Sequence, residues 1–203
     1  MQRLARLLSL ASLFGLTATM GCVEDQELLI VKGTYDLNDV CVLDDSAPLS
    51  IDTIDVSIEA PFALGLLVAN LQTNNKHSNT GIEDDGEVQL DHAEVSMTFA
   101  GAAGGGFELP IPTDSVPSGG ELGVILNVPS SVVQAIAPSV APGDLPLLEM
   151  TVVLVGHRTS PAGNGKLGEV RTREYTFPFQ LCNGCVTCQT NCGLPQISDC
   201  VDE

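Results

Sequence analysis

The chain has 203 residues, of which 26 are acidic and eight are basic, so its formal net charge at neutral pH is −18. This excess of carboxylates excludes nucleic-acid binding, because affinity for phosphate requires clustered lysine and arginine. It also argues against electrostatic attachment to anionic lipids. Hydrophobic residues make up 44% of the chain, which is too apolar for a disordered protein. With no tryptophan and only two tyrosines, the core must consist mainly of valine, isoleucine and leucine, which favours strands.

Residues 1–21 have the features of an export signal. Two arginines precede an apolar segment, residues 7–16, which is about half the length needed to span a bilayer. Small and polar residues follow it. We therefore expect this segment to be a signal peptide. Its removal would leave six basic and 26 acidic residues, a formal charge of −20.

The sequence Thr19-Met20-Gly21-Cys22 resembles the bacterial lipobox, at which a signal peptidase cleaves before a cysteine that carries a thioether-linked diacylglycerol. Gly21 and Cys22 match this pattern, whereas Thr19 stands where leucine is usual. The resemblance implies that Cys22 is lipidated and begins an extracytoplasmic, membrane-anchored protein. Val23 stands where an aspartate would retain the protein at the inner membrane, so the implied location is the outer membrane or the cell surface.

An acidic tether, residues 22–27, precedes a region in which apolar and polar residues alternate. A period of two predicts strands with one buried and one exposed face. Pro178 has no N–H to donate to a neighbouring strand. It therefore predicts that the last strand lies at an edge of the sheet or leaves the sheet there. The predicted strands are 28–31, 54–59, 66–68, 88–99, 122–128, 151–155 and 175–181.

Clusters of glycine, proline and serine separate these strands. Asp85-Gly86 predicts a turn, and residues 160–165 predict a hairpin loop between two late strands. Residues 104–106 and 115–120 are expected to be connections.

One short helix is expected, in which Ser130 or Ser131 caps residues 132–137 and Pro138 ends the helix. About seven short strands and a single helical turn predict an all-β fold. We expect one antiparallel β-sandwich of the immunoglobulin or fibronectin kind over residues 28–181, with a disulfide-rich C-terminal tail. This layout resembles uncharacterised bacterial envelope lipoproteins, a resemblance that implies no activity.

The tail, residues 182–203, holds five of the seven cysteines. Lipidation of Cys22 leaves six, which can all form disulfides in an oxidising compartment. Five tail cysteines cannot pair among themselves, so we expect Cys41 to be joined to the tail. Closing a loop of roughly 140 residues would contribute about 5 kcal/mol on the loop-entropy model. The expected disulfide cysteines, whose connectivity stays open, are Cys41, Cys182, Cys185, Cys188, Cys192 and Cys200.

Three other uses of the tail cysteines stay open. The spacing C-x2-C-x2-C-x3-C resembles the cluster ligands of bacterial ferredoxins, although Gly193 replaces the proline that follows there. Four thiolates would also suit zinc. Cys182-x-x-Cys185 has the spacing of thioredoxin-like enzymes, but Asn183-Gly184 predicts a turn where those enzymes have a helix N-terminus. Oxidation in an exported protein disfavours both metal sites.

The histidines and one acidic patch are the remaining candidates for a catalytic or metal site. His77, His92 and His157 belong to no hydrolase or zinc-protease motif and are expected at the surface. The densest acidic patch is Glu83-Asp84-Asp85-Gly86-Glu87 together with Asp91. It is expected to be a solvated hairpin turn, with calcium binding as the alternative.

The sequence therefore predicts a non-enzymatic envelope lipoprotein with a structural or binding role at the cell surface, without a cofactor. Its expected partner is the membrane, through the lipid on Cys22. The alternatives are a secreted thiol–disulfide redox protein that uses the tail cysteines and a calcium-dependent adhesion module.

Overall fold

A computed structural model describes residues 28–38, 42–72, 86–100, 102–112, 114–159 and 166–185. The predicted export signal, the predicted lipidation site at Cys22, and the cysteines at 41, 188, 192 and 200 lie outside these ranges. So do His77 and the acidic residues 83–85. No helix within the described ranges is long and apolar enough to cross a membrane.

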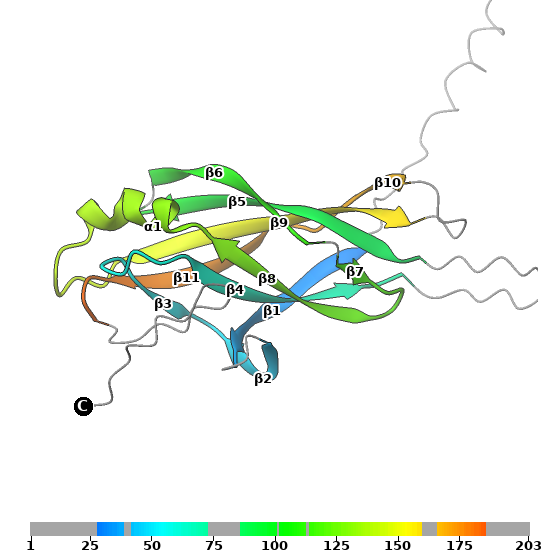
Figure 1. The fold of residues 1–203 in the computed structure, drawn as a ribbon, viewed down its shortest axis with the longest axis horizontal. Coiled ribbons are helices and arrows are strands. Elements are labelled where there is room, and N and C mark those ends of the chain that lie inside the picture. Colours follow the sequence, from blue (N-terminus) through cyan, green and yellow to red (C-terminus); the bar gives the residue numbers. More distant parts are fainter. Residues whose placement is uncertain are drawn as a thin grey trace, which may run out of the picture.

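Two β-sheets face one another across a hydrophobic core (Figure 1). The smaller sheet has the strand order β2-β1-β4-β8, and the larger has the order β3-β11-β9-β5-β6, with β10 added beside β9 and β7 beside β5. The strands are β1 (Leu29–Leu37), β2 (Leu43–Leu49), β3 (Asp52–Asp55), β4 (Phe62–Asn70), β5 (Val88–Phe99), β6 (Ala102–Pro110), β7 (Ser115–Val116), β8 (Glu121–Val128), β9 (Leu147–Thr159), β10 (Lys166–Arg171) and β11 (Tyr175–Cys182).

This architecture confirms the all-β sandwich, but with eleven strands in the described residues where the sequence predicted about seven. Residues 104–106 are not a connection; they lie within β6 and pair with β5, because glycine-rich backbone can still complete a ladder. Residues 115–116 likewise form β7, which pairs with Val88 and Gln89. The strand β2 (LDDSAPL) was missed, since its acidic and proline-containing sequence shows no alternation.

The strand predicted at 54–59 is shorter and runs differently. β3 ends at Asp55 and pairs in parallel with β11, so the sandwich is not purely antiparallel. A turn follows, closed by a hydrogen bond from the Ile58 N–H to the Asp55 carbonyl oxygen, 3.2 Å. Val56 is buried in that turn. The alternation that predicted a strand here therefore reflects burial of a turn residue.

Two other local predictions need correction. The helix α1 (Ser130–Ile136) begins after Pro129 and has no side-chain cap, because the fixed φ of proline already suits the helix entrance. A 3₁₀ turn, η1 (Ala137–Ser139), follows and contains Pro138. Pro178 lies on an interior strand between β9 and β3 rather than on an edge strand. β3 begins to pair at Phe179, so β11 has only one neighbour at Pro178 itself.

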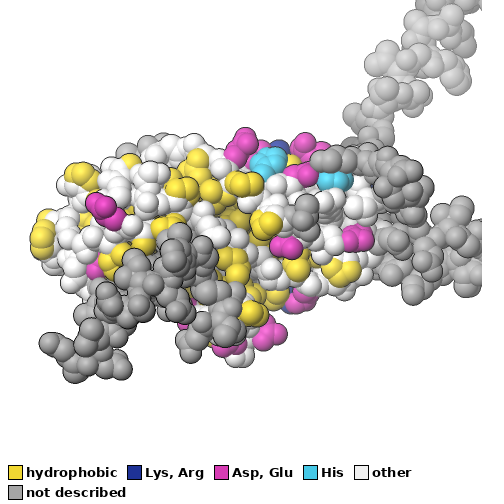
Figure 2. All heavy atoms as spheres, in the orientation of Figure 1, with side chains coloured by type: hydrophobic (Ala, Val, Ile, Leu, Met, Phe, Trp, Pro, Cys, Tyr) yellow, Lys and Arg dark blue, Asp and Glu magenta, His cyan; other side chains and the backbone are white. Residues whose placement is uncertain are grey.

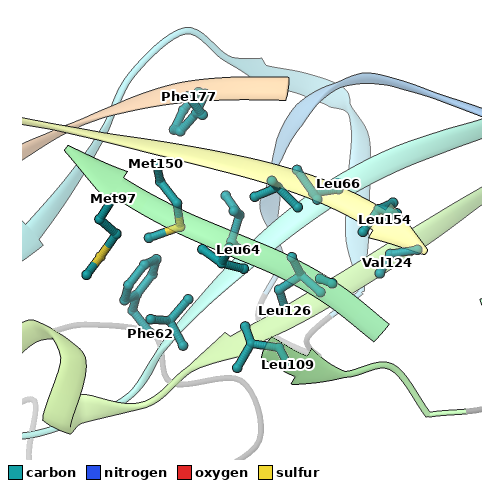
Figure 3. Packing of buried hydrophobic residues seen from close by; sticks show 14 of the residues in the cluster. Phe62, Leu64, Leu66, Met97, Leu109, Val124, Leu126, Met150, Leu154 and Phe177 are labelled. Atoms are coloured by element: carbon teal, nitrogen blue, oxygen red, sulfur yellow. The ribbon is translucent and has the colours of Figure 1, made fainter. Parts of the chain in front are cut away.

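The core is built from aliphatic side chains of both sheets and a few aromatic rings (Figure 3). Phe177, Phe179 and Leu181 line one face of β11, as their alternation predicts. The ring of Phe179 packs edge-on against Phe62 of the facing sheet, with centroids 5.2 Å apart. The hydroxyl of Tyr175, on the same face, lies 3.0 Å from Oγ1 of the buried Thr34 on β1. These contacts join the two layers.

A β-bulge interrupts the long β5–β9 ladder at Asp91, where the alternation of apolar residues also slips in the sequence. Leu90 faces Gly156 and His92 faces Val155, so Asp91 is the extra residue. Gly156 lies so close to β5 that an added Cβ would overlap the backbone oxygen of Gln89. The bulge therefore requires glycine at this position.

Gly156→Ala should lower the free energy of unfolding by about 1–3 kcal/mol, because a backbone atom blocks the new methyl group and cannot rotate away. Urea denaturation of the purified domain measures the effect. Gly106→Ala on β6 is the control, since its Cβ would lie 3.3 Å from the Val95 oxygen and needs only a small shift. Equal stability of the two variants would contradict this account of the bulge.

Candidate functional site

The chain leaves the sandwich through a disulfide loop at the end of β11. Cys182 is buried and Cys185 is exposed, and the two form a disulfide with Cα atoms 5.8 Å apart. Gly184 between them has a φ of +77°, so Asn183-Gly184 forms the expected turn. The Cys182 carbonyl oxygen accepts a hydrogen bond from the Val56 N–H, 2.8 Å, which extends the β3–β11 pairing by one residue.

A buried carboxylate holds this loop. Oδ1 of Asp55 accepts hydrogen bonds from the Ser57 N–H at 2.9 Å, the Ser57 hydroxyl at 2.7 Å and the Gly184 N–H at 2.9 Å. Asp55 is only 1% exposed. One side chain thus ties the turn after β3 to the disulfide loop after β11. Asp55 was not singled out by the sequence, because nothing local distinguishes it from the other acidic residues.

The surroundings of this disulfide oppose thiol reactivity. A carboxylate oxygen of Asp55 and both sulfur atoms lie within 4.8 Å of one another. A negative charge at this distance disfavours formation of a thiolate, whereas reactive cysteines lie in positive surroundings or at helix N-termini. Here the cysteine pair follows a strand. The geometry therefore favours a bond that stays closed and stabilises the chain exit.

Asp55, Cys182 and Cys185 also form a group with metal-ligating atom types. The two sulfurs are joined to each other, and Oδ1 of Asp55 already accepts three hydrogen bonds. Zinc would require the reduced thiolates. The donors present therefore do not fit a metal ion while the disulfide is closed.

The described histidines lie with acidic residues on the outer face of the larger sheet (Figure 2). Nδ1 of the largely buried His157 is 2.8 Å from Oδ2 of Asp91, the bulge residue. His92 lies 3.9 Å from Glu94, and Arg171 pairs with Glu94 and Glu169. The sequence placed all three histidines at the surface; His157 is instead buried, because the bulge turns Asp91 toward it.

Two residues of the acidic patch considered for calcium, Glu87 and Asp91, make contacts within the fold. Asp91 is engaged by His157, and the carbonyl oxygen of Glu87 accepts a hydrogen bond from the Thr159 N–H at 3.0 Å. Both interactions fix the start of the β5–β9 ladder. Within the described part of the patch, the contacts are therefore structural.

The outer face of the smaller sheet carries a shallow apolar groove of about 400 Å³. Leu43, at the start of β2, lies over β4 and β8, where an added Cβ on Gly65 or Gly123 would meet it at 2.6 Å or 3.2 Å. Because these two positions are glycines, the start of β2 can lie directly over β4 and β8. The groove is lined by Val42, Leu43, Asp45, Leu67, Gly123 and Ile125. The sequence did not indicate it, because its residues come from three separate strands.

Two carboxylates, those of Asp52 and Asp44, have pKa values that their surroundings shift. The pKa of Asp52 on β3 is raised by desolvation, an effect that the Thr53 N–H opposes and the charge of Asp36 reinforces. By contrast, the hydroxyl and N–H of Ser46 lower the pKa of the exposed Asp44.

Comparisons with known proteins add little to this description. No protein-family model matches the chain, and no curated protein sequence matches it. Among solved structures, the solution structure of a late embryogenesis abundant (LEA) protein is 10% identical with a TM-score of 0.39, covering 77% of this chain and 71% of that one. AggA, the major subunit of aggregative adherence fimbriae type I from Escherichia coli, is 14% identical with a TM-score of 0.34, covering 66% and 90%.

Asp55→Ala should destabilise the protein by about 1–3 kcal/mol, because three partly buried hydrogen bonds, from the Ser57 N–H, the Ser57 hydroxyl and the Gly184 N–H, lose their acceptor. Asp55→Asn is the matched control: it keeps an oxygen acceptor and should lose less. Chemical denaturation of the oxidised protein measures both. An unchanged free energy of unfolding in Asp55→Ala would show that this carboxylate does not hold the chain exit.

Asp52→Asn should raise the free energy of unfolding at neutral pH, because the wild-type fold holds an ionised carboxylate where burial favours the neutral form. As the pH falls through the raised folded-state pKa, Asp52 takes up a proton and the wild type gains stability. The advantage of the variant should therefore shrink, reaching its minimum below the unfolded pKa of about 4.

Asp44→Asn provides the control of opposite sign. Its folded-state pKa is lowered, so the stability that the ionised carboxylate contributes is present above the unfolded pKa and is lost as the pH falls through the folded-state pKa. This variant should be destabilised at neutral pH and converge with the wild type in acid. Urea denaturation from pH 3 to pH 7, a range of about four units around the carboxyl pKa, measures both. The same sign for both variants would refute the assignment.

Proposed function

We propose that this protein is a non-enzymatic, lipid-anchored component of a bacterial envelope, whose β-sandwich has a structural or binding role at the cell surface. The observation that carries the proposal is the short distance between the lipobox-like cysteine and the folded domain. Leu29, the first residue of β1, is fully buried and follows Cys22 by seven residues. Fully extended, these residues span at most about 25 Å, so a lipid on Cys22 would hold the sandwich close to the membrane.

The strand pairing indicates which end would face the membrane. Leu29 pairs with Asn70 at one end of β4. The disulfide loop lies beyond the other end: Nδ2 of Asn183 donates to the Val140 carbonyl oxygen, 3.1 Å, just after the helix that follows β8, and β8 ends opposite Phe62. The nine residues of β4 span about 30 Å. The anchor would therefore hold one end of the sandwich and present the cysteine loop at the other.

The described polar clusters support a non-enzymatic role. The Asp91–His157 hydrogen bond and the Glu94–Arg171 ion pair both join residues of different strands in the larger sheet, and a negative charge on Asp55 disfavours a reactive thiolate. The competing redox function predicts a cysteine pair that is reduced and reoxidised at a mild potential. Thiol counting in the denatured mature protein separates the two: zero free thiols support structural disulfides, and a reversible pair supports redox chemistry.

In a bacterial host that processes lipoproteins, mass spectrometry should find diacylglycerol on Cys22 as the first residue, and the protein should partition into detergent. Cys22→Ala should release it to the aqueous phase, because the two acyl chains contribute about 0.8 kcal/mol per buried CH₂. Val23→Ala is the matched control, since it leaves Gly21-Cys22 intact. An unmodified N-terminus elsewhere, or partitioning unchanged by Cys22→Ala, would overturn the proposal.

A further inference from the structure

The groove on the smaller sheet lies beside one of the cysteines whose partner the sequence left open. Val42, which lines the groove, is 56% exposed and directly follows Cys41. Leu67 of β4 and Ile125 of β8 also line it. The Cα atom of any cysteine joined to Cys41 must therefore lie within about 10 Å of the Cα atom of Val42, because bridged Cα atoms lie about 5–6 Å apart and consecutive Cα atoms about 3.8 Å apart.

The closed disulfide at the chain exit restricts the remaining pairings. With Cys182 bound to Cys185 and Cys22 lipidated, four cysteines remain, and four allow three pairings. In each of the three, Cys41 is joined to one of Cys188, Cys192 and Cys200. Six cysteines allow fifteen pairings, and the closed disulfide reduces these to three. Each of the three joins the tail to Cys41, which directly precedes Val42 of the groove.

The tail is long enough to make this connection. The described chain ends at Cys185, near the end of the sandwich at which β4 begins. Leu67 lies five residues along β4 from Phe62, about 17 Å away. Cys192 and Cys200 follow Cys185 by seven and 15 residues, which can extend to about 24 Å and about 50 Å, whereas the three residues to Cys188 reach only about 10 Å. The connection therefore requires no rearrangement of the two sheets.

The composition of the tail suits the groove. Residues 186–198 contain no charged side chain, although the chain as a whole has a net charge of −18. Leu194, Pro195 and Ile197 form its apolar part, and the acidic residues lie in the last five positions. Covering the exposed Val42 and the partly exposed Leu43 and Ile125 with residues 186–198 removes apolar surface from water without burying a charge.

We propose that the uncharged part of the tail, residues 186–198, is the occupant of the groove lined by Val42, Leu67 and Ile125, held there by a disulfide between Cys41 and a tail cysteine. The tail then covers the part of the outer face of the smaller sheet on which Val42 and Ile125 reach solvent beside Leu43 of β2. The pairing argument rests on the lipidation of Cys22 proposed above, whereas the groove and the reach of the tail do not.

The test places a photo-crosslinking residue in the groove of the full-length oxidised protein. Ile125→p-benzoylphenylalanine lies on the groove floor, far in sequence from Cys41, and should cross-link to peptides from residues 186–203 of the same molecule. The matched control is Val153→p-benzoylphenylalanine, half-buried on β9 of the other sheet, which should give at least tenfold less of this product. If the first variant does not fold, the exposed Asn127 on β8 takes its place.

Non-reducing peptide mapping completes the experiment and should find Cys41 linked to a tail cysteine. Cross-linking of Ile125 to a second copy of this chain, no cross-link to the tail, or Cys41 as a free thiol would overturn the inference. The mass of the N-terminal peptide, measured in the same digest, tests lipidation separately. A lipidated Cys22 with a free Cys41 would refute tail docking alone, and an unlipidated Cys22 with a docked tail would refute the anchor alone.

Discussion

Burial of aliphatic side chains between two sheets is the constraint on which the rest of this structure depends. With few aromatic rings available, the layers are held by leucine, valine and methionine, with Phe62 and Phe179 in contact across the core. Each buried polar group must then find a partner inside the sandwich. Asn70 donates from Nδ2 to two carbonyl oxygens, at 2.8 Å and 3.1 Å, and Thr34 meets Tyr175. These polar contacts fix the position of one sheet relative to the other.

The excess of carboxylates acts at the surface that this core leaves exposed. With 26 acidic and eight basic residues, acidic side chains outnumber basic ones by more than three to one, and two of the described ion pairs join different strands. Lys32 bridges β1 to Glu121 of β8, and Arg171 bridges β10 to Glu94 of β5. Asp55 is the exception, since it is buried and stabilised by hydrogen bonds to the backbone. The polar outer face therefore stays in water, and the chain exit is fixed by Asp55.

The two ends of the sandwich differ. The end at which β1 begins is the one nearer to Cys22 along the chain, and the opposite end holds the disulfide loop, α1 and the last described residue, Cys185 (Figure 1). With the proposed anchor at the first end, both outer faces of the sandwich would be exposed. One is polar, and the other carries the apolar groove beside Cys41. A tail that returns over the groove would cover the less soluble of these faces and lock the N-terminal and C-terminal parts of the chain together.

The sequence by itself determined the properties that depend on neighbouring residues: the period-two faces such as Phe177 to Leu181, the turn at Asn183-Gly184, and the slip in alternation at Asp91. Only the tertiary structure decided what depends on strand pairing between distant segments. The parallel partner of β3, the placement of Asp55 under Gly184, the pairing of Asp91 with His157 and the groove between β2, β4 and β8 each join residues far apart in the chain. Local patterns record which face of a strand is buried, but not which strand lies beside it, because many pairings bury the same apolar faces equally well.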